Sequence, residues 1–297
     1  MKTEKLRGSI VPLVTPFRNG RVDEDAIASL IDWQIESGSH GISVTGTTGE
    51  PTALTRTERE RVILHAAACV NGRIPFVPAT GSNNHDETVA LSRMAEKAGA
   101  DAVLIIVPYY VRPSQEGLFQ HFKGVADSVG IPVILYNIPG RAAINLEIST
   151  VARLRDSCRN IVGVKEANPD FSHITRLIGA LGRDFLVYSG IELLCFPVLA
   201  IGGVGYVSAT GNIMPKEVAR LYDLVQANKW REAQDLHYHL MPLNDAVFLE
   251  INPVPAKTAL AMMKRISPEV RLPLAPLSTE NERKLRDVLQ RYRLIPS

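Results

Sequence analysis

Eight short apolar runs recur along the first two-thirds of the sequence, and their spacing constrains the fold more than any other feature. Each run is rich in Val and Ile and is bounded by Gly, Pro or Asn, which is typical of parallel strands buried on both faces. Successive runs mostly begin about 25–35 residues apart, the length of one strand–helix unit. The runs are Ser9–Phe17, Gly41–Thr45, Pro75–Thr80, Ala102–Pro108, Pro132–Asn137, Ile161–Lys165, Phe185–Ser189 and Val204–Ser208.

Helical patterns fill the intervals between these runs. Asp25–Gly38 has apolar residues at a 3.6-residue period and ends on glycine, and Thr55-Arg56-Thr57-Glu58 is a capping box that opens the next helix. Eight strands alternating with eight helices predict a closed (β/α)8 TIM barrel, an α/β fold. An open doubly wound sheet is the alternative, but the sequence lacks its early GxGxxG turn. The other predicted helices are Glu87–Ala98, Glu116–Val129, Leu146–Arg155, Phe171–Leu181, Ile191–Leu199 and Glu217–Gln226.

The remainder of the chain reads as helices without strands. The 297 residues exceed the roughly 250 of a typical barrel, so we expect a barrel over residues 1–228 and a C-terminal helical appendage over residues 229–297. Asn252-Pro253 and the proline-rich stretch Ser267–Pro276 separate its predicted helices, which are Trp230–Phe248, Val254–Met263 and Thr279–Arg293.

Composition and charge exclude several classes of function. A chain that is 45% hydrophobic and 22% charged is ordinary for a globular protein. Its net charge of +2 gives no reason to expect nucleic acid or an anionic membrane as a partner. The three separated cysteines form neither a disulfide framework nor a metal knuckle, and the N-terminal apolar run, broken by Pro12, is too short for a signal sequence or membrane span. We therefore expect a cytoplasmic protein.

The polar residues that follow the strands are the candidates for a site, because barrel active sites lie at the carboxyl ends of the strands. The sixth strand ends on Lys165, where an ammonium is costly to bury and a neutral amine can attack a carbonyl. Each rim group has an ordinary interpretation as a turn, a packing aromatic or a surface residue. The joint placement of these groups around a lysine favours an active site. The groups are Gly46-Thr47-Thr48-Gly49-Glu50, Pro108-Tyr109-Tyr110 and Tyr136-Asn137-Ile138-Pro139-Gly140-Arg141.

This set of residues favours Schiff-base chemistry. It lacks the acid pair of a glycosidase and any cluster of metal ligands, so we expect neither a metal nor a cofactor. The amine of Lys165 can attack a 2-oxo acid, and the protonated imine makes the neighbouring C–H acidic. Tyr136 can relay protons, and Thr47 and Thr48 can hold the carboxylate of the oxo acid. Arg141 can clamp the carboxylate of a second substrate.

Together and in this order, the motifs resemble the dihydrodipicolinate synthase and N-acetylneuraminate lyase family of class I aldolases over nearly the whole chain. Within this family, the double threonine Thr47-Thr48 and Arg141 resemble the pattern of the synthase branch. That resemblance implies condensation of pyruvate, bound to Lys165, with L-aspartate 4-semialdehyde in the biosynthesis of diaminopimelate and lysine. Besides the rim groups above, its markers are Val164-Lys165-Glu166 and Asn252-Pro253-Val254-Pro255.

The resemblance also implies roles for single residues. Tyr136 and Thr47 relay protons, and Tyr110 completes their triad from a neighbouring subunit, which implies a homotetramer built from tight dimers. The positions implied to bind substrate are Thr48, Arg141, Gly190 and Val207.

Two departures from the synthase pattern keep alternatives open. Ala142-Ala143 replaces the usual Thr-Gly after the arginine, and Ile191-Glu192 replaces two acids after Ser189-Gly190. One alternative is a related pyruvate-type lyase, aldolase or dehydratase acting on a 2-keto-3-deoxy sugar acid or another 2-oxo acid. Another is a barrel that binds a keto acid without turnover, because fold alone does not imply catalysis.

An allosteric site is a further expectation from the resemblance. In the lysine-inhibited bacterial members, a pocket at the dimer interface uses positions that match Asn83, Glu87 and Tyr109. Two permanent cations next to an ammonium ligand would repel it. We expect lysine to inhibit weakly or not at all, because the positions that are a serine and two histidines in those members are here Pro51, Arg56 and Arg59.

Overall fold

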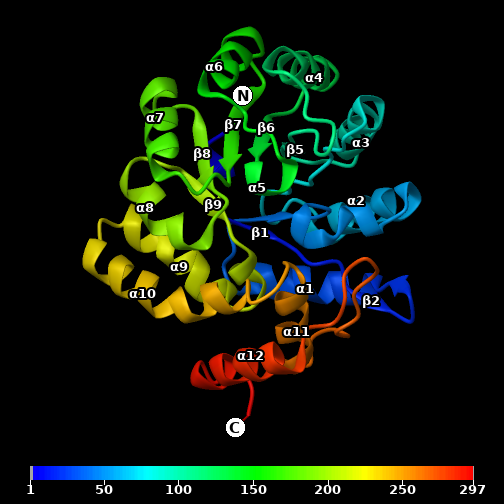
Figure 1. The fold of residues 1–297 in the computed structure, drawn as a ribbon, viewed down its shortest axis with the longest axis vertical. Helices are drawn as coiled ribbons and strands as arrows, with labels where there is room; N and C mark the ends of the chain where they lie inside the picture. Colours follow the sequence, from blue (N-terminus) through cyan, green and yellow to red (C-terminus); the bar gives the residue numbers. More distant parts are fainter. Residues whose placement is uncertain (1–2, 297) are drawn as a thin grey trace.

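The computed structural model describes residues 3–296, and its centre is a parallel sheet enclosed by helices (Figure 1). Within these residues, seven strands pair in the order β4–β1–β9–β8–β7–β6–β5. A two-stranded antiparallel hairpin, β2 (Phe17–Arg18) with β3 (Arg21–Val22), stands apart, where the sequence had predicted one strand continuing to Phe17. The strands of the main sheet are β1 (Gly8–Pro12), β4 (Gly41–Ser43), β5 (Val103–Ile106), β6 (Val133–Asn137), β7 (Ile161–Glu166), β8 (Leu186–Ser189) and β9 (Gly205–Val207).

The remaining predicted strand, Pro75–Thr80, closes the barrel without forming a regular strand. It lies between β4 and β5 and makes one isolated bridge to each side, Ile42↔Phe76 and Ala79↔Leu104. Two of its residues are prolines, which have no backbone N–H to donate, so a continuous ladder cannot form. The prediction of an eight-fold barrel is confirmed, and the prediction of a regular strand here is wrong.

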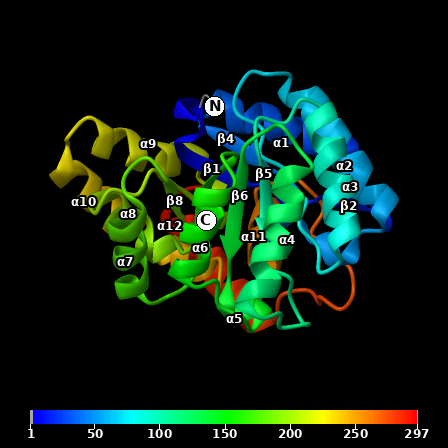
Figure 2. The same ribbon diagram turned by 90° about the horizontal axis from the view of Figure 1, so that it is seen from above.

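A ring of helices covers the outside of the strands, as Figures 1 and 2 show. The predicted capping box opens α2, because Thr55 accepts a hydrogen bond from the Glu58 backbone and Glu58 accepts one from the Thr55 backbone. The predicted helix Ile191–Leu199 begins later, at Cys195, after a 3-10 turn. The helices of the ring are α1 (Glu24–Glu36), α2 (Arg56–Val70), α3 (His85–Lys97), α4 (Gln115–Asp127), α6 (Ile148–Ser157), α7 (Phe171–Leu181), α8 (Cys195–Ala200) and α9 (Pro215–Gln226). The short helix α5 (Pro139–Ala142) lies instead beyond the carboxyl end of β6.

Alternation along the strands divides the buried side chains between two regions. In β6, Val133 and Leu135 pack toward the surrounding helices, whereas Ile134 and Tyr136 belong to the cluster inside the barrel. The inward set ends in a polar residue at the carboxyl end of the strand. The period of two therefore decides which strand-end side chains face the barrel mouth.

Three more helices complete the described chain: α10 (Trp230–Ala246), α11 (Val254–Met262) and α12 (Thr279–Arg291). They share an apolar cluster with α8 and α9, and α12 lies outside the ring in Figure 1. The division into residues 1–228 and 229–297 stays a prediction. Among the described residues, none of the helices has the length and apolar character needed to cross a membrane.

Candidate active site

Lys165 and Tyr136 face each other inside the barrel at the carboxyl ends of neighbouring strands. They are register partners in the parallel pairing of β6 with β7. The Lys165 side chain is buried, with 6% of the residue exposed, and its Nζ lies 4.1 Å from the centroid of the Tyr136 ring. An amine held against the face of a phenol ring, away from bulk water, is placed to react with a small molecule in the barrel mouth.

Glycine at position 190 leaves room for the lysine. A Cβ atom there would lie 2.9 Å from Lys165 Cε and 2.9 Å from Ala167 Cβ, closer than real Cβ contacts allow. Gly190 also donates its backbone N–H to the carbonyl of Glu166. The turn after β8 therefore packs directly against the amine end of the Lys165 side chain.

The turn after β4 places two threonines beside this pair. Thr47 Oγ1 lies 3.3 Å from the Tyr136 hydroxyl, within hydrogen-bonding distance. Thr48 is buried, and its hydroxyl accepts a hydrogen bond of 3.0 Å from the amide of Asn252. A hydroxyl chain thus runs from Thr47 to the phenol, while Thr48 is held by the C-terminal part of the chain.

These residues line one inner cavity of about 60 Å³. Since one water molecule needs about 10–15 Å³ of cavity volume, the inner cavity suits a molecule of a few heavy atoms. A wider cavity of about 230 Å³ adjoins it, and Thr47, Tyr136, Arg141 and Asn252 line both. The predicted site residues that line the inner cavity are Lys165, Tyr136, Thr47, Thr48, Arg141, Gly190 and Val207.

Arg141 stands at the boundary between the two cavities. It lies on α5, the short helix that follows β6, and its guanidinium donates a hydrogen bond of 3.2 Å to the carbonyl of Asn252. The side chain is otherwise exposed, which leaves donors free for a carboxylate that enters from the wider cavity.

The sequence interpretation missed the contribution of Glu192. In the sequence this residue is only a departure from a family pattern, yet it is buried and lines the inner cavity with Lys165. Its carboxyl accepts a hydrogen bond of 2.6 Å from the backbone N–H of Ala209, and burial raises its pKa. Its position three residues after Ser189, which ends β8, is the signal that could have identified it.

A second contribution missed from sequence comes from the C-terminal helices. Lys257 on α11 is fully buried and forms an ion pair of 2.6 Å with Glu50, which ends the threonine turn in a left-handed conformation at φ 52°. Burial lowers the pKa of Lys257, and Glu50 opposes that effect. The ammonium also lies 4.1 Å from the centroid of the Phe17 ring. No local sequence signal links residues so far apart.

Tyr110 does not join the other predicted residues in this chain. It is 88% exposed, with φ 75°, and it is absent from the lining of both cavities. Its neighbour Tyr109 lines the wider cavity.

The predicted allosteric positions lie around the start of α3. Asn83 is exposed, and Glu87 accepts a hydrogen bond of 2.6 Å from the Ser82 hydroxyl. Arg59 is buried and donates hydrogen bonds to the carbonyls of Ala79 and Gly81, and burial lowers its pKa.

In the part of the chain that the structure describes, no group of three or more His, Cys, Asp or Glu residues could hold a metal ion.

Comparison with known proteins identifies the family of the chain. A sequence model of the Dihydrodipicolinate synthetase family matches residues 5–292. A relative from Thermodesulfovibrio yellowstonii, named 4-hydroxy-tetrahydrodipicolinate synthase, is 47% identical over 289 residues, which cover 97% of this chain and 99% of the relative. A relative of the same name from Thermus thermophilus is 46% identical over 291 residues, covering 98% and 97%.

Solved structures give the same result. Dihydrodipicolinate synthase from Aquifex aeolicus superposes with a TM-score of 0.95 at 43% identity, over 97% of this chain and 98% of that one. The enzyme from Cyanidioschyzon merolae, solved with lysine bound, superposes with a TM-score of 0.94 at 34% identity, over 98% and 99%. The chain therefore belongs to the dihydrodipicolinate synthetase family.

Proposed function

We propose that this chain condenses pyruvate with L-aspartate 4-semialdehyde through a Schiff base, as a 4-hydroxy-tetrahydrodipicolinate synthase in diaminopimelate and lysine biosynthesis. The observation that carries the proposal is the buried Lys165 amine, which lies against Tyr136 in a cavity sized for a small oxo acid. The names of the relatives at 46–47% identity favour this reaction over cleavage or dehydration of a sugar acid.

The first half of the reaction uses the inner cavity. The Lys165 amine adds to the carbonyl carbon of pyruvate, and loss of water from the adduct leaves a protonated imine. Removal of a proton from the methyl carbon then gives an enamine. Tyr136 accepts and donates these protons, and its hydroxyl transfers them to the hydroxyl of Thr47. Thr48, Gly190 and Val207 enclose the oxo acid.

The second half joins the two substrates. The enamine carbon attacks the aldehyde carbon of the second substrate, the aldehyde oxygen takes a proton, and the imine to Lys165 forms again. The amino group of the second substrate then adds to the imine carbon and displaces the Lys165 amine, which closes the ring of the product and frees the lysine. Arg141 binds the carboxylate of that substrate in the wider cavity, where its guanidinium is exposed.

The assembly and location belong to the same proposal. Tyr110 and the neighbouring Val111 are both exposed, as expected for side chains that a second copy covers. Tyr110 then completes the proton relay in the partner's site, within a homotetramer of tight dimers in the cytoplasm. The ligands are small molecules, without nucleic acid, membrane, metal or cofactor.

Regulation by lysine is proposed to be weak or absent. Around Asn83, Glu87 and Tyr109, the buried guanidinium of Arg59 supplies a permanent positive charge. That charge disfavours an ammonium ligand.

Borohydride trapping tests the proposal. The protein is incubated with pyruvate and borohydride, and mass spectrometry locates the reduced adduct. We expect one adduct on Lys165, unchanged in Lys97→Arg, which alters an exposed lysine on α3, and lost in Lys165→Arg. Turnover is then compared between aspartate semialdehyde and 2-keto-3-deoxy sugar acids. Lack of an adduct overturns Schiff-base chemistry, and turnover of sugar acids alone supports the alternative reaction.

A further inference from the structure

A polar cluster lies directly behind the two reacting side chains. Asn137 and Glu166 are register partners, one residue beyond Tyr136 and Lys165 on the same strands. Because neighbouring strand residues face opposite sides, Asn137 and Glu166 point away from the barrel mouth, toward the surrounding helices. Both are almost completely buried, with 0% and 1% of the residue exposed.

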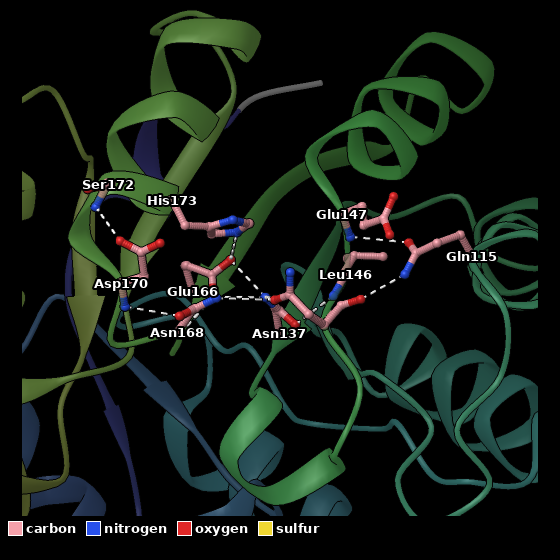
Figure 3. Close-up of polar contacts among 10 residues, drawn as sticks. Gln115, Asn137, Leu146, Glu147, Glu166, Asn168, Asp170, Ser172 and His173 are labelled. Atoms are coloured by element: carbon pink, nitrogen blue, oxygen red, sulfur yellow. Dashed lines mark hydrogen bonds and ion pairs between the residues drawn. The ribbon is translucent and has the colours of Figure 1, made fainter.

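Glu166 is the hub of this cluster, as Figure 3 shows. Its two oxygens accept from the Asn137 amide at 2.9 and 3.0 Å, and the Asn168 backbone N–H donates at 2.8 Å. The His173 ring, on α7, completes the set, with Nε2 3.3 Å from Glu166 Oε2. A buried carboxylate is tolerated only with such partners, so removing one changes the arrangement of the rest.

Asn137 connects this hub to the loop that carries Arg141. Its amide also donates to the Asn145 side chain at 2.8 Å, and its oxygen accepts from the Leu146 backbone N–H at 3.0 Å. The loop leaves the sheet after Asn137 and returns at Asn145 and Leu146, so one side chain ties both of its ends together. Gln115, on α4, also holds the end of this loop, because its amide donates a hydrogen bond of 2.8 Å to the Asn145 carbonyl.

We propose that the cluster of Asn137, Glu166 and His173 is a positioning device for the Arg141 loop, and that it sets how tightly the protein binds its second substrate. The proposal rests on the proposed function, because Arg141 is assigned there to the carboxylate of that substrate. None of the three residues lines either cavity, and we assign their effect to the loop.

The charge of His173 makes this device sensitive to pH. The hydrogen bond that the His173 ring donates to Glu166 raises the pKa of His173 above its usual 6.5, with a further contribution from Asp170, while burial and Arg176 act in the opposite direction. With a raised pKa, the ionic form of the pair is fully present below pH 6.5 and is lost as pH rises through the pKa of the folded protein. The loop should then loosen, and binding of the second substrate should weaken.

Kinetics separate this role from a merely structural one. In Glu166→Gln and His173→Gln, we expect the KM of aspartate semialdehyde to rise roughly tenfold at pH 6.5, since a charge-assisted hydrogen bond is lost. The KM of pyruvate and the rate of borohydride trapping should stay within about twofold. His173→Arg, which keeps the positive charge at all pH values, should restore tight binding and remove the weakening at higher pH.

A control and an independent readout complete the experiment. Glu96→Gln removes a carboxylate that accepts from the Gly130 N–H at 2.7 Å before β6, at the opposite end of the barrel, and should change neither KM. Hydrogen exchange of the 138–146 segment should accelerate about tenfold in His173→Gln and stay unchanged in Glu96→Gln. Should Glu166→Gln fail to fold, the two His173 variants carry the test.

Three results would each overturn the proposal: an unchanged KM for the second substrate, equal changes in both KM values, or unchanged exchange of the 138–146 segment in His173→Gln. Failure of the proposed function looks different, because the wild-type protein would then form no pyruvate adduct or would not turn over aspartate semialdehyde, while the exchange measurement still reports on the loop.

Discussion

The amide of Asn252 donates a hydrogen bond of 3.0 Å to the hydroxyl of Thr48. The carbonyl of the same residue accepts from Arg141. One residue from the segment between α10 and α11 thereby joins the turn after β4 to the short helix after β6. The mouth of the barrel is consequently completed by the C-terminal part of the chain.

Replacing this asparagine should weaken binding of the first substrate. Asn252→Ala leaves the Thr48 hydroxyl unsupported, and the loss of one buried hydrogen bond of about 1–1.5 kcal/mol predicts a roughly tenfold rise in the KM of pyruvate. Steady-state kinetics of the wild type and the variant measure this KM. Asn160→Ala is the matched control, because Asn160 bonds to the carbonyls of Ala126 and Val129 outside the site and should affect stability alone.

The buried pair of Lys257 and Glu50 should show strong coupling in a double-mutant cycle. Either Lys257→Met or Glu50→Gln leaves an unpaired buried group and should lower the free energy of unfolding by about 3–5 kcal/mol. The double variant should lose less free energy of unfolding than the sum of the losses in the two single variants. Chemical denaturation measures all four proteins, and additive losses would show that the pair does not interact.

Gly190→Ala should slow formation of the pyruvate adduct by about tenfold or more, because the new methyl group meets Lys165 Cε. Gly179 on α7 has open space around it, and Gly179→Ala should leave trapping unchanged. Borohydride trapping followed over time compares the two. Equal rates in Gly190→Ala and the wild type would contradict the close packing seen here.

Acid should weaken the contact between Glu58 and Arg271. Hydrogen bonds from Arg271 hold the pKa of Glu58 at about 2, below its usual 4.5. A depressed acid pKa stabilises the fold above pH 4.5, and that contribution disappears as pH falls toward 2. Since both side chains are partly exposed, we expect about 1 kcal/mol. In Glu58→Gln, the free energy of unfolding should depend less steeply on pH over this window.

Lysine should inhibit the protein only weakly. The guanidinium of Arg59 is fixed by the carbonyls of Ala79 and Gly81 and cannot lose its charge. Initial rates measured against rising lysine concentration test this prediction. Half-inhibition at sub-millimolar lysine would show it to be wrong, and inhibition gained in Arg59→His would support the role of the charge.

Local pattern was sufficient to predict the barrel and most of its rim. Short apolar runs mark buried parallel strands, and the closed topology brings their carboxyl ends to one rim, so the strand-end positions of Lys165, Tyr136 and Thr47 already implied proximity. The strand Pro75–Thr80 was harder, because its apolar pattern is correct while its prolines interrupt the ladder.

The sequence by itself determined which side chains stand at the ends of the strands, because periodicity and strand-ending residues are local properties. Tertiary structure alone decided the register that opposes Tyr136 to Lys165 and Asn137 to Glu166. It also decided that Asn252 and Lys257 reach the turn after β4. Register and contacts between distant residues depend on the packing of the whole barrel, and no short stretch of sequence carries that information.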